Sequence, residues 1–338
     1  MKRLHCLLLL MFYLTSVFAQ NIEADRISDR IIILNENYFR SVAILTNRGV
    51  ILIDTREPLE KMEEIKQIIR QEFETDTFCY IINTHGCPEH ILGNPAFPNT
   101  PVIMNENFFK RKKIYSRQKK YIDSLEIICT DTIGKAEQDE ICSKLEQGRN
   151  WRKYCIKAMK IKPDISYSEK MNLYFDSLTI QMALTGLGHG YSTFIYIPEE
   201  NFLHVSVQSS NWAITKFTIP EDMDGSDFLP YQIKTLKDFI AISDSLKYIV
   251  PCHGEYYSAD TLKQMLSYYT EMYDFAKVSY FSNTDLNTYR SECTIEKRFS
   301  KYELFQDLDD KEIQRHNENI DWLWNYFSQF NKEENKSN

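Results

Sequence analysis

After residue 18 the chain has no long uninterrupted apolar run, and it has no internal repeat and no low-complexity segment. The first absence excludes a later membrane-spanning helix, which needs roughly 20 apolar residues. Positive charge is also scarce, since 48 acidic residues outnumber 40 Lys and Arg residues and leave a formal charge of -8. That balance argues against nucleic acid as the main partner. With 43% hydrophobic residues, we expect one elaborated, enzyme-sized domain with a large core.

The apolar run from Leu7 to Phe18 follows Lys2 and Arg3 and precedes Ala19. A charged start, an apolar middle and a small residue at the end predict a signal peptide over residues 1–19, cleaved after Ala19. The alternative, an uncleaved membrane anchor, needs a longer run. We therefore expect an exported protein, periplasmic or extracellular, with no stable membrane span.

Residues 84 to 90 read T-H-G-C-P-E-H and directly follow the apolar run that ends the strand predicted over Phe78 to Asn83. His85, Cys87 and Glu89 are spaced by two residues, so their side chains can converge where the strand ends. Imidazole nitrogen, thiolate sulfur and carboxylate oxygen suit zinc better than calcium or magnesium. The alternative is a set of packed or hydrogen-bonded side chains at a strand end.

Two further histidines lie in glycine-containing turns that follow apolar strands. His189 lies in G-L-G-H-G and His253 in P-C-H-G-E. The chain has seven histidines, and four of the six beyond the predicted signal peptide occupy these three turns. This concentration favours a shared metal site.

The order of these pieces resembles that of the metallo-β-lactamase superfamily. The matching segments are Gly49 to Thr55, Thr84 to His90, Gly93 and Asn94, Gly186 to His189, Pro198 to Asn201, and Pro251 to Glu255. The resemblance implies an αβ/βα four-layer sandwich with a metal site at one edge of its sheets. It also implies a hydrolase that acts on lactams, thioesters, lactones or phosphoesters.

The resemblance carries the ligands of the first family metal over to His85, Cys87 and His189, with a cysteine in place of one histidine. Those of the second metal carry over to Glu89, His90 and His253, with a glutamate in place of an aspartate. The aspartate that bridges the two metals falls on Val207, and no carboxylate lies between Glu200 and Glu221. We therefore expect one zinc ion at most, because nothing would offset the repulsion between two cations.

The mechanism that the resemblance leaves in place uses a zinc-bound hydroxide, because zinc lowers the pKa of its water toward neutrality and polarises the substrate. Glu89 would be the catalytic residue that orients the water or acts as a base. The substrate would be a small molecule with an ester, thioester, lactone or lactam-like bond. The alternative is a catalytically inactive homologue that uses the cleft for binding, and a redox or metal-sensing role is a third hypothesis.

The positions of two cysteines also bear on the alternative of a catalytically inactive binding protein. Cys87 replaces a family histidine and Cys252 a family glycine, so both stand beside the expected cleft and could form a disulfide in an oxidising compartment. Such a bridge would remove Cys87 as a ligand, since only the thiolate binds metal. Seven cysteines remain after signal cleavage, so at least one cannot pair within the chain. A local bridge among Cys129, Cys142 and Cys155 is a further prediction.

Apolar periodicity predicts the remaining elements. Strands are expected at residues 31–34, 41–45, 50–53, 78–83, 101–104, 171–175, 178–185 and 248–250, with a hairpin over 192–206. Helices are expected from Pro58, around residues 233–240, over 258–280 and over 309–330. We predict a metallo-β-lactamase-like domain over residues 20–280, with a helical insertion at about 105–164 that opens on a basic stretch, and a C-terminal helical extension over 281–338. The oligomeric state stays open.

Overall fold

The computed structural model describes residues 22–36, 39–56, 59–106, 122–124, 126, 135–158, 160–185, 192–206, 214, 228–254, 256–306 and 308–334. The predicted signal peptide, the basic stretch near residue 110, Pro58, His189 and Val207 lie outside these ranges. Among the described residues, no helix is both long and apolar enough to cross a membrane.

The first sheet takes its seven strands in chain order. They are Glu23–Arg26 (β1), Ile31–Glu36 (β2), Phe39–Thr46 (β3), Gly49–Ile53 (β4), Phe78–Asn83 (β5), Val102–Asn105 (β6) and Ile165–Tyr167 (β7). The pairs from β1 to β4 are antiparallel, and those from β4 to β7 are parallel. Sequence periodicity missed β1 and β7, which are short strands at the two ends of the sheet.

The second sheet has five strands in the order β12-β11-β10-β9-β8. Their bounds are Lys170–Phe175 (β8), Leu178–Thr185 (β9), Ser192–Ile197 (β10), Phe202–Ser206 (β11) and Tyr248–Pro251 (β12). All pairs are antiparallel except β11 with β12. The predicted hairpin over residues 192–206 is confirmed as β10 and β11.

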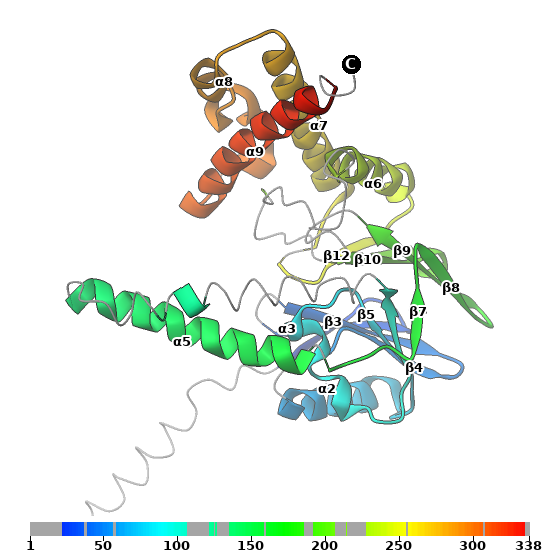
Figure 1. The fold of residues 1–338 in the computed structure, drawn as a ribbon. Helices are drawn as coiled ribbons and strands as arrows, with labels where there is room; N and C mark the ends of the chain where they lie inside the picture. The colour runs from blue at the N-terminus through cyan, green and yellow to red at the C-terminus, as the bar shows by residue number, and fades with distance from the viewer. Residues whose placement is uncertain are drawn as a thin grey trace, which may run out of the picture.

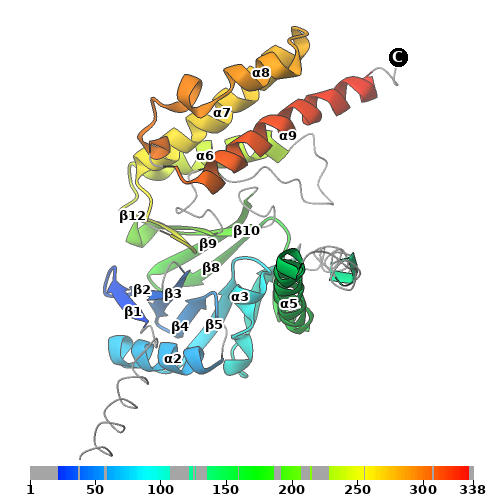
Figure 2. The same ribbon diagram turned by 90° about the vertical axis from the view of Figure 1, so that its left-hand side faces the viewer.

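The two sheets lie face to face with helices outside, as Figures 1 and 2 show. Along β2, Ile31 and Ile33 pack between the sheets, whereas Ile32 and Leu34 pack beneath the outer helix. This alternation follows from the two-residue period of a strand, and it explains why strands buried on both faces read as continuous apolar runs. The described part of the chain therefore forms four layers.

Helical segments complete these layers and the C-terminal region. Those before the second sheet are Leu59–Phe73 (α2), Pro88–Ile91 (α3), Asn94–Ala96 (η1) and Lys135–Ala158 (α5), and a turn at Pro198–Glu200 (η3) joins β10 to β11. Phe228–Ser243 (α6), Ala259–Phe281 (α7) and Leu286–Glu292 (α8) follow. The chain then continues through Ile295–Phe299 (η5), Glu303–Phe305 (η6) and Asp310–Glu334 (α9).

The predicted helices are confirmed where the structure describes them. On α2 the stripe Met62, Ile65, Ile69 and Phe73 is buried against the first sheet. The insertion is helical over α5, which lies beside α3.

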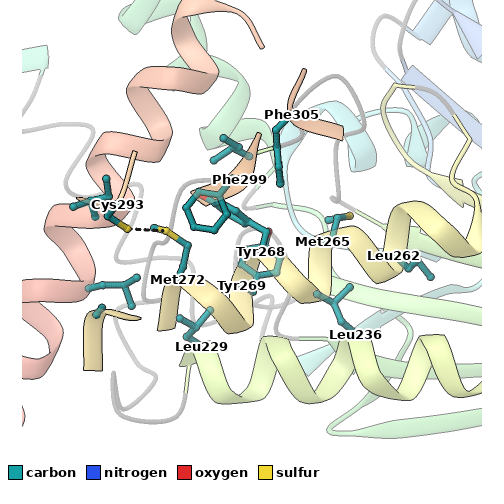
Figure 3. Packing of buried hydrophobic residues seen from close by; sticks show 14 of the residues in the cluster. Leu229, Leu236, Leu262, Met265, Tyr268, Tyr269, Met272, Cys293, Phe299 and Phe305 are labelled. Atoms are coloured by element: carbon teal, nitrogen blue, oxygen red, sulfur yellow. Dashed lines mark hydrogen bonds between the residues drawn. The ribbon is translucent and has the colours of Figure 1, made fainter. Parts of the chain in front are cut away.

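The C-terminal helices share one core with the second sheet. Figure 3 shows Leu229 and Leu236 on α6, Met265 and Tyr269 on the neighbouring α7, and Phe299 beyond α7. This cluster also includes residues of β11, β12, α8 and α9. On α9, Trp324 packs against Tyr280 and Tyr289 of the same chain. The boundary predicted at residue 281 stays a prediction, but the extension packs on the sandwich.

Candidate metal centre

The site forms where strand ends from both sheets meet. β4 and β5 are parallel neighbours, so Asp54 and the turn that begins at Thr84 leave the first sheet side by side. His253 follows β12 of the second sheet and forms a β-bridge with Phe39. The backbone N–H of Arg40 donates to the carbonyl of Cys252 over 2.8 Å, which ties the two sheets together at this edge.

Asp54 is the fully buried centre of the hydrogen bonds. Its Oδ1 accepts from the Thr84 backbone N–H at 2.8 Å, and its Oδ2 accepts from the Thr84 hydroxyl at 2.7 Å. The same Oδ2 lies 2.9 Å from Nδ1 of His90. Asp54 adopts a φ of 56°, a left-handed conformation that Asp and Asn tolerate better than most residues.

These bonds fix which ring nitrogens carry protons. A carboxylate only accepts, so His90 donates from Nδ1, and the lone pair of its Nε2 faces Nε2 of His253, 3.3 Å away. The Thr84 hydroxyl gives its proton to Asp54 and therefore accepts from Nδ1 of His85, 3.0 Å away. Both imidazoles thus have Nε2 in the form that binds metal, the usual effect of a carboxylate behind a ligating histidine.

Three overlapping groups of donor atoms each lie within 4.8 Å of one another. One is His85, Cys87 and Glu89, and another is His90, Cys252 and His253. The third, Asp54 with His85 and His90, is the hydrogen-bonded layer behind them. Glu89 therefore lies with His85 and Cys87, whereas Cys252, which the sequence reading had not counted as a ligand, lies with the last two histidines.

The donor chemistry of the first group fits a zinc ion. Glu89 Oε2 is buried and has no hydrogen-bond partner among the described residues. An unpaired buried carboxylate oxygen costs free energy unless a cation or proton satisfies it. Nitrogen, sulfur and oxygen donors at one point are the ligand types that zinc accepts.

The two thiols beside the site differ in exposure. Cys252 is fully buried, and burial raises the pKa of its thiol well above the usual value, with Asp54 adding to the effect. Cys87 is half-buried, and the structure has no disulfide between the two. The bridge stays a prediction for the oxidised protein. Elsewhere, Cys142 is disulfide-bonded.

Phe39 forms one wall of the site. Its ring centroid lies 4.6 Å from that of His90 and 5.1 Å from that of His253. The guanidinium of Arg56 packs over this ring, with Cζ 4.6 Å from the centroid, and its Nη1 pairs with Glu36 at 3.1 Å. Burial lowers the pKa of Arg56 to about 10, so it remains charged at neutral pH.

His204 on β11 is a further buried imidazole that the sequence reading did not single out. Its Nδ1 accepts from the Ser206 backbone N–H at 3.2 Å, and its Nε2 has no hydrogen-bond partner among the described residues. Burial, with smaller contributions from His90 and Arg40, lowers the pKa of His204 to about 4. No motif marked His204, because only its position between the sheets makes it unusual.

The structure thus brings together five of the six predicted ligands, His85, Cys87, Glu89, His90 and His253. The sixth, His189, lies outside the described residues, as does Val207 at the position of the family's bridging aspartate. The residue that sequence reasoning missed is Asp54. Its signal was present in the G-V-I-L-I-D-T run, whose aspartate stands at a strand end.

No protein-family model and no curated protein matches this sequence. Solved structures do match. A metallo-beta-lactamase from Pontibacter korlensis has a TM-score of 0.50 and 17% identity, with 74% of this chain and 99% of that one covered. The stereoselective inverting sec-alkylsulfatase Pisa1 from Pseudomonas sp. has a TM-score of 0.56 and 11% identity. That match covers 90% of this chain but only 50% of the sulfatase. At these identities the likeness is one of fold, and it confirms the predicted sandwich.

Proposed function

The chain has the metallo-β-lactamase fold, and from this fold and its donor atoms we propose an exported metal-dependent hydrolase that holds one zinc ion. Its substrate would be a small molecule with an ester, thioester, lactone or lactam-like bond. One observation carries the proposal. His85, Cys87 and Glu89 converge within 4.8 Å, and the buried Glu89 Oε2 has no hydrogen-bond partner among the described residues.

Hydrogen bonds within the chain set the protonation of two ligand side chains without a bound metal. Asp54 and Thr84 hold His90 and His85 with their Nδ1 atoms protonated, so the lone pair of each ring is on Nε2, the nitrogen that would bind the metal. Cys87 would bind as the thiolate, and its negative charge would offset part of the charge of the cation. His189 would complete a set of three ligands with His85 and Cys87, as the family resemblance implies, and the fourth position would be left for water. When bound, zinc would lower the pKa of its water ligand and polarise the substrate carbonyl.

Glu89 would take the proton of the attacking water at Oε2. This oxygen accepts no hydrogen bond from the described residues, so no competing donor has to be displaced. The same carboxylate could then return the proton to the leaving group as a general acid. The aromatic ring of Phe39, packed on His90 and His253, would keep bulk water from one side of the reacting atoms.

Sequence supports a single ion. Val207 stands at the position of the family's bridging aspartate, and no carboxylate lies between Glu200 and Glu221. Two divalent cations a few ångströms apart repel each other strongly unless an anionic group lies between them. The proposed resting enzyme therefore holds one tightly bound ion.

Export is proposed from the signal-like residues 1–19, and the disulfide at Cys142 supports it, because such bonds persist in oxidising compartments. Expression in a bacterium with a periplasm would test it. N-terminal sequencing of the periplasmic fraction should give a chain that begins at Gln20. Full-length protein retained in the cytosol would contradict export.

The catalytic proposal is tested by metal analysis of protein purified without added zinc, with a hydrolysis panel of an ester, a thioester, a lactone, a lactam and a secondary alkyl sulfate. We expect close to one zinc per chain and turnover of at least one panel member. His85→Ala should lose both, whereas Glu89→Gln should lose turnover first. His316→Gln, in a buried histidine of the C-terminal core, is the matched control that should change neither.

Metal-free protein with an intact fold would reject the enzyme and favour the alternative, a binding protein of the same fold. Bound metal without turnover of any panel member would support the metal centre and reject the proposed substrate class.

A further inference from the structure

Positive charge collects in the second half of α5 and the residues that follow it. Residues 144–162 hold seven basic side chains and one acidic side chain, whereas the whole chain carries a formal charge of -8. The basic residues are Lys144, Arg149, Arg152, Lys153, Lys157, Lys160 and Lys162. Figures 1 and 2 show α5 outside both sheets. A positive segment on the outside of an acidic protein favours contact with an anionic partner.

Three of these cations form one row along the helix. Arg149, Lys153 and Lys157 are spaced by four residues, so they follow one another on successive turns. All three side chains are exposed. At 3.6 residues per turn, the row lies on the side away from Cys155 and Ala158, which are buried. The row therefore faces away from the protein.

The contacts of the row within the chain are with neutral groups, apart from one ion pair. Arg149 pairs with Glu126 at 2.8 Å. Lys153 donates to the amide oxygen of Asn150 at 3.4 Å, and Nζ of Lys157 lies 5.6 Å from the ring centroid of Tyr154. Like charges one turn apart weaken a helix. An anionic surface beside the row would reduce this repulsion.

Exposed apolar side chains flank the row on both sides. Tyr154 is 38% exposed on one side, and Ile156 is 41% exposed on the other. Trp151, 39% exposed, precedes Tyr154 by three residues and is its neighbour on the helix surface. Single exposed apolar residues are normal, but three within six positions of one helix indicate a contact surface.

The combination of positive charge with exposed apolar groups selects the kind of partner. Lysine and arginine attract the phosphates of anionic lipids, and tyrosine and tryptophan favour the boundary between headgroups and hydrocarbon. Isoleucine favours the hydrocarbon itself. A nucleic acid could stack its bases on Tyr154 or Trp151, but it has no apolar layer for Ile156. A membrane that contains anionic lipid fits all of these groups.

We propose that α5 docks the protein on an anionic phospholipid membrane. Arg149, Lys153 and Lys157 contact the headgroups, and Tyr154 and Ile156 enter the boundary between headgroups and hydrocarbon. The helix lies along the membrane surface and does not cross it. This docking is a further property of the chain and does not depend on the candidate metal centre or on hydrolysis.

Co-sedimentation of the full chain with lipid vesicles tests the proposal. One set of vesicles is phosphatidylcholine alone, and the other also contains phosphatidylglycerol, which is anionic. Binding is expected on the anionic vesicles at low salt, and it should be lost on neutral vesicles and at high salt. Mass spectrometry should show the same N-terminus in every preparation, because the apolar run from Leu7 to Phe18 could itself bind lipid wherever it is retained.

Two double variants separate charge from apolar contact. Lys153→Gln with Lys157→Gln should weaken binding to the anionic vesicles about 25-fold, because each lysine near such a surface contributes about fivefold. Tyr154→Ser with Ile156→Ser should weaken it about tenfold, because two apolar side chains would no longer be buried at the boundary. All four side chains are exposed, so both variants should fold, which far-ultraviolet circular dichroism checks.

Matched controls remove the same groups elsewhere. Lys234→Gln with Lys237→Gln removes two exposed lysines, one turn apart, from α6, where no large apolar side chain is exposed among the described residues. Tyr174→Ser removes a tyrosine that is 67% exposed on β8. Neither control should change binding by more than about twofold, because these groups lie outside the proposed contact.

Weaker binding of both double variants, with unchanged controls, would support the proposal. Binding that survives both double variants, or no binding to the anionic vesicles, would overturn it. Dependence on the lysine pair alone would also overturn it, because attraction between charges does not distinguish a membrane from another polyanion. A single-stranded DNA oligonucleotide that binds as tightly, and depends on both pairs, would overturn the choice of partner.

Discussion

Replacing Asp54 with asparagine is the sharpest test of how the site is organised. Oδ2 of Asp54 accepts from two donors, the Thr84 hydroxyl and Nδ1 of His90. An asparagine can keep its one oxygen on the Thr84 backbone N–H. Its NH₂ group then takes the place of Oδ2, and this group is a donor that faces two other donors. Asparagine also tolerates the φ of 56°, so the change alters the hydrogen bonds rather than the backbone.

The hydrogen bonds can be restored only if the Thr84 hydroxyl and Nδ1 of His90 change from donors to acceptors. The Thr84 hydroxyl can rotate and accept, but His90 must move its proton from Nδ1 to Nε2. A protonated Nε2 cannot bind metal. Loss of such a partner behind a ligating histidine typically lowers metal affinity about 10–100-fold, which corresponds to about 1.4–2.8 kcal/mol. The imperfectly paired buried groups should also lower the free energy of unfolding of the metal-free protein by about 1–3 kcal/mol.

Three measurements check this chain of causes. Competition with a chromophoric chelator gives the zinc affinity, and urea unfolding of metal-free protein gives the stability. Nitrogen-15 spectra of the histidine rings report which nitrogen of His90 carries the proton. Asp176→Asn is the control, because Asp176 accepts from Asn47 at an exposed turn.

Zinc affinity within threefold of the parental value, with His90 still protonated at Nδ1, would refute the reasoning. A loss of affinity without a change of tautomer would show that charge, rather than proton placement, is what Asp54 supplies.

The remaining predictions concern packing, pH and metal. Gly93→Ala should cost about 1–3 kcal/mol of unfolding free energy, because an added Cβ would lie 2.4 Å from the Arg56 carbonyl oxygen. Gly148→Ala, whose Cβ would meet its nearest neighbour at 3.4 Å inside α5, should instead gain up to about 1 kcal/mol, and urea denaturation measures both. Burial holds the pKa of His204 at about 4, below the unfolded value, so the unfolded chain binds more protons between pH 6.5 and 4. The free energy of unfolding should therefore fall by up to about 3 kcal/mol as the pH drops through that window. His204→Gln should make it less dependent on pH, and an unchanged pH dependence would contradict the attribution to His204. Chelation should lower stability by about 2.7 kcal/mol if zinc was present at a hundred times its Kd, and an equal response in His85→Ala would contradict a metal at this site.

Local patterns in the sequence determined most of the elements. The continuous apolar runs of β2 to β5 are buried on both faces, and the stripe from Met62 to Phe73 has the period of a helix with one buried face. The strand-end turns at Thr84 and Pro251 could also be read directly, because a run of metal-binding residue types after an apolar strand is rare. Short edge strands such as β1 escaped notice, since four exposed residues carry no apolar pattern.

Only the tertiary structure decided between the two possible groupings of the site residues. The family resemblance assigns Glu89 to the same set as His90, whereas the two-residue spacing predicts that it converges with His85 and Cys87. In space Glu89 lies with His85 and Cys87, while Cys252 joins His90 and His253. Asp54 became the centre of the hydrogen bonds only because β4 and β5 are parallel neighbours. The physical reason is that ligand geometry depends on distances of a few ångströms between residues up to 163 positions apart. Residue types and local periods constrain which side chains can take part, and the pairing and packing of the two sheets set which of them meet.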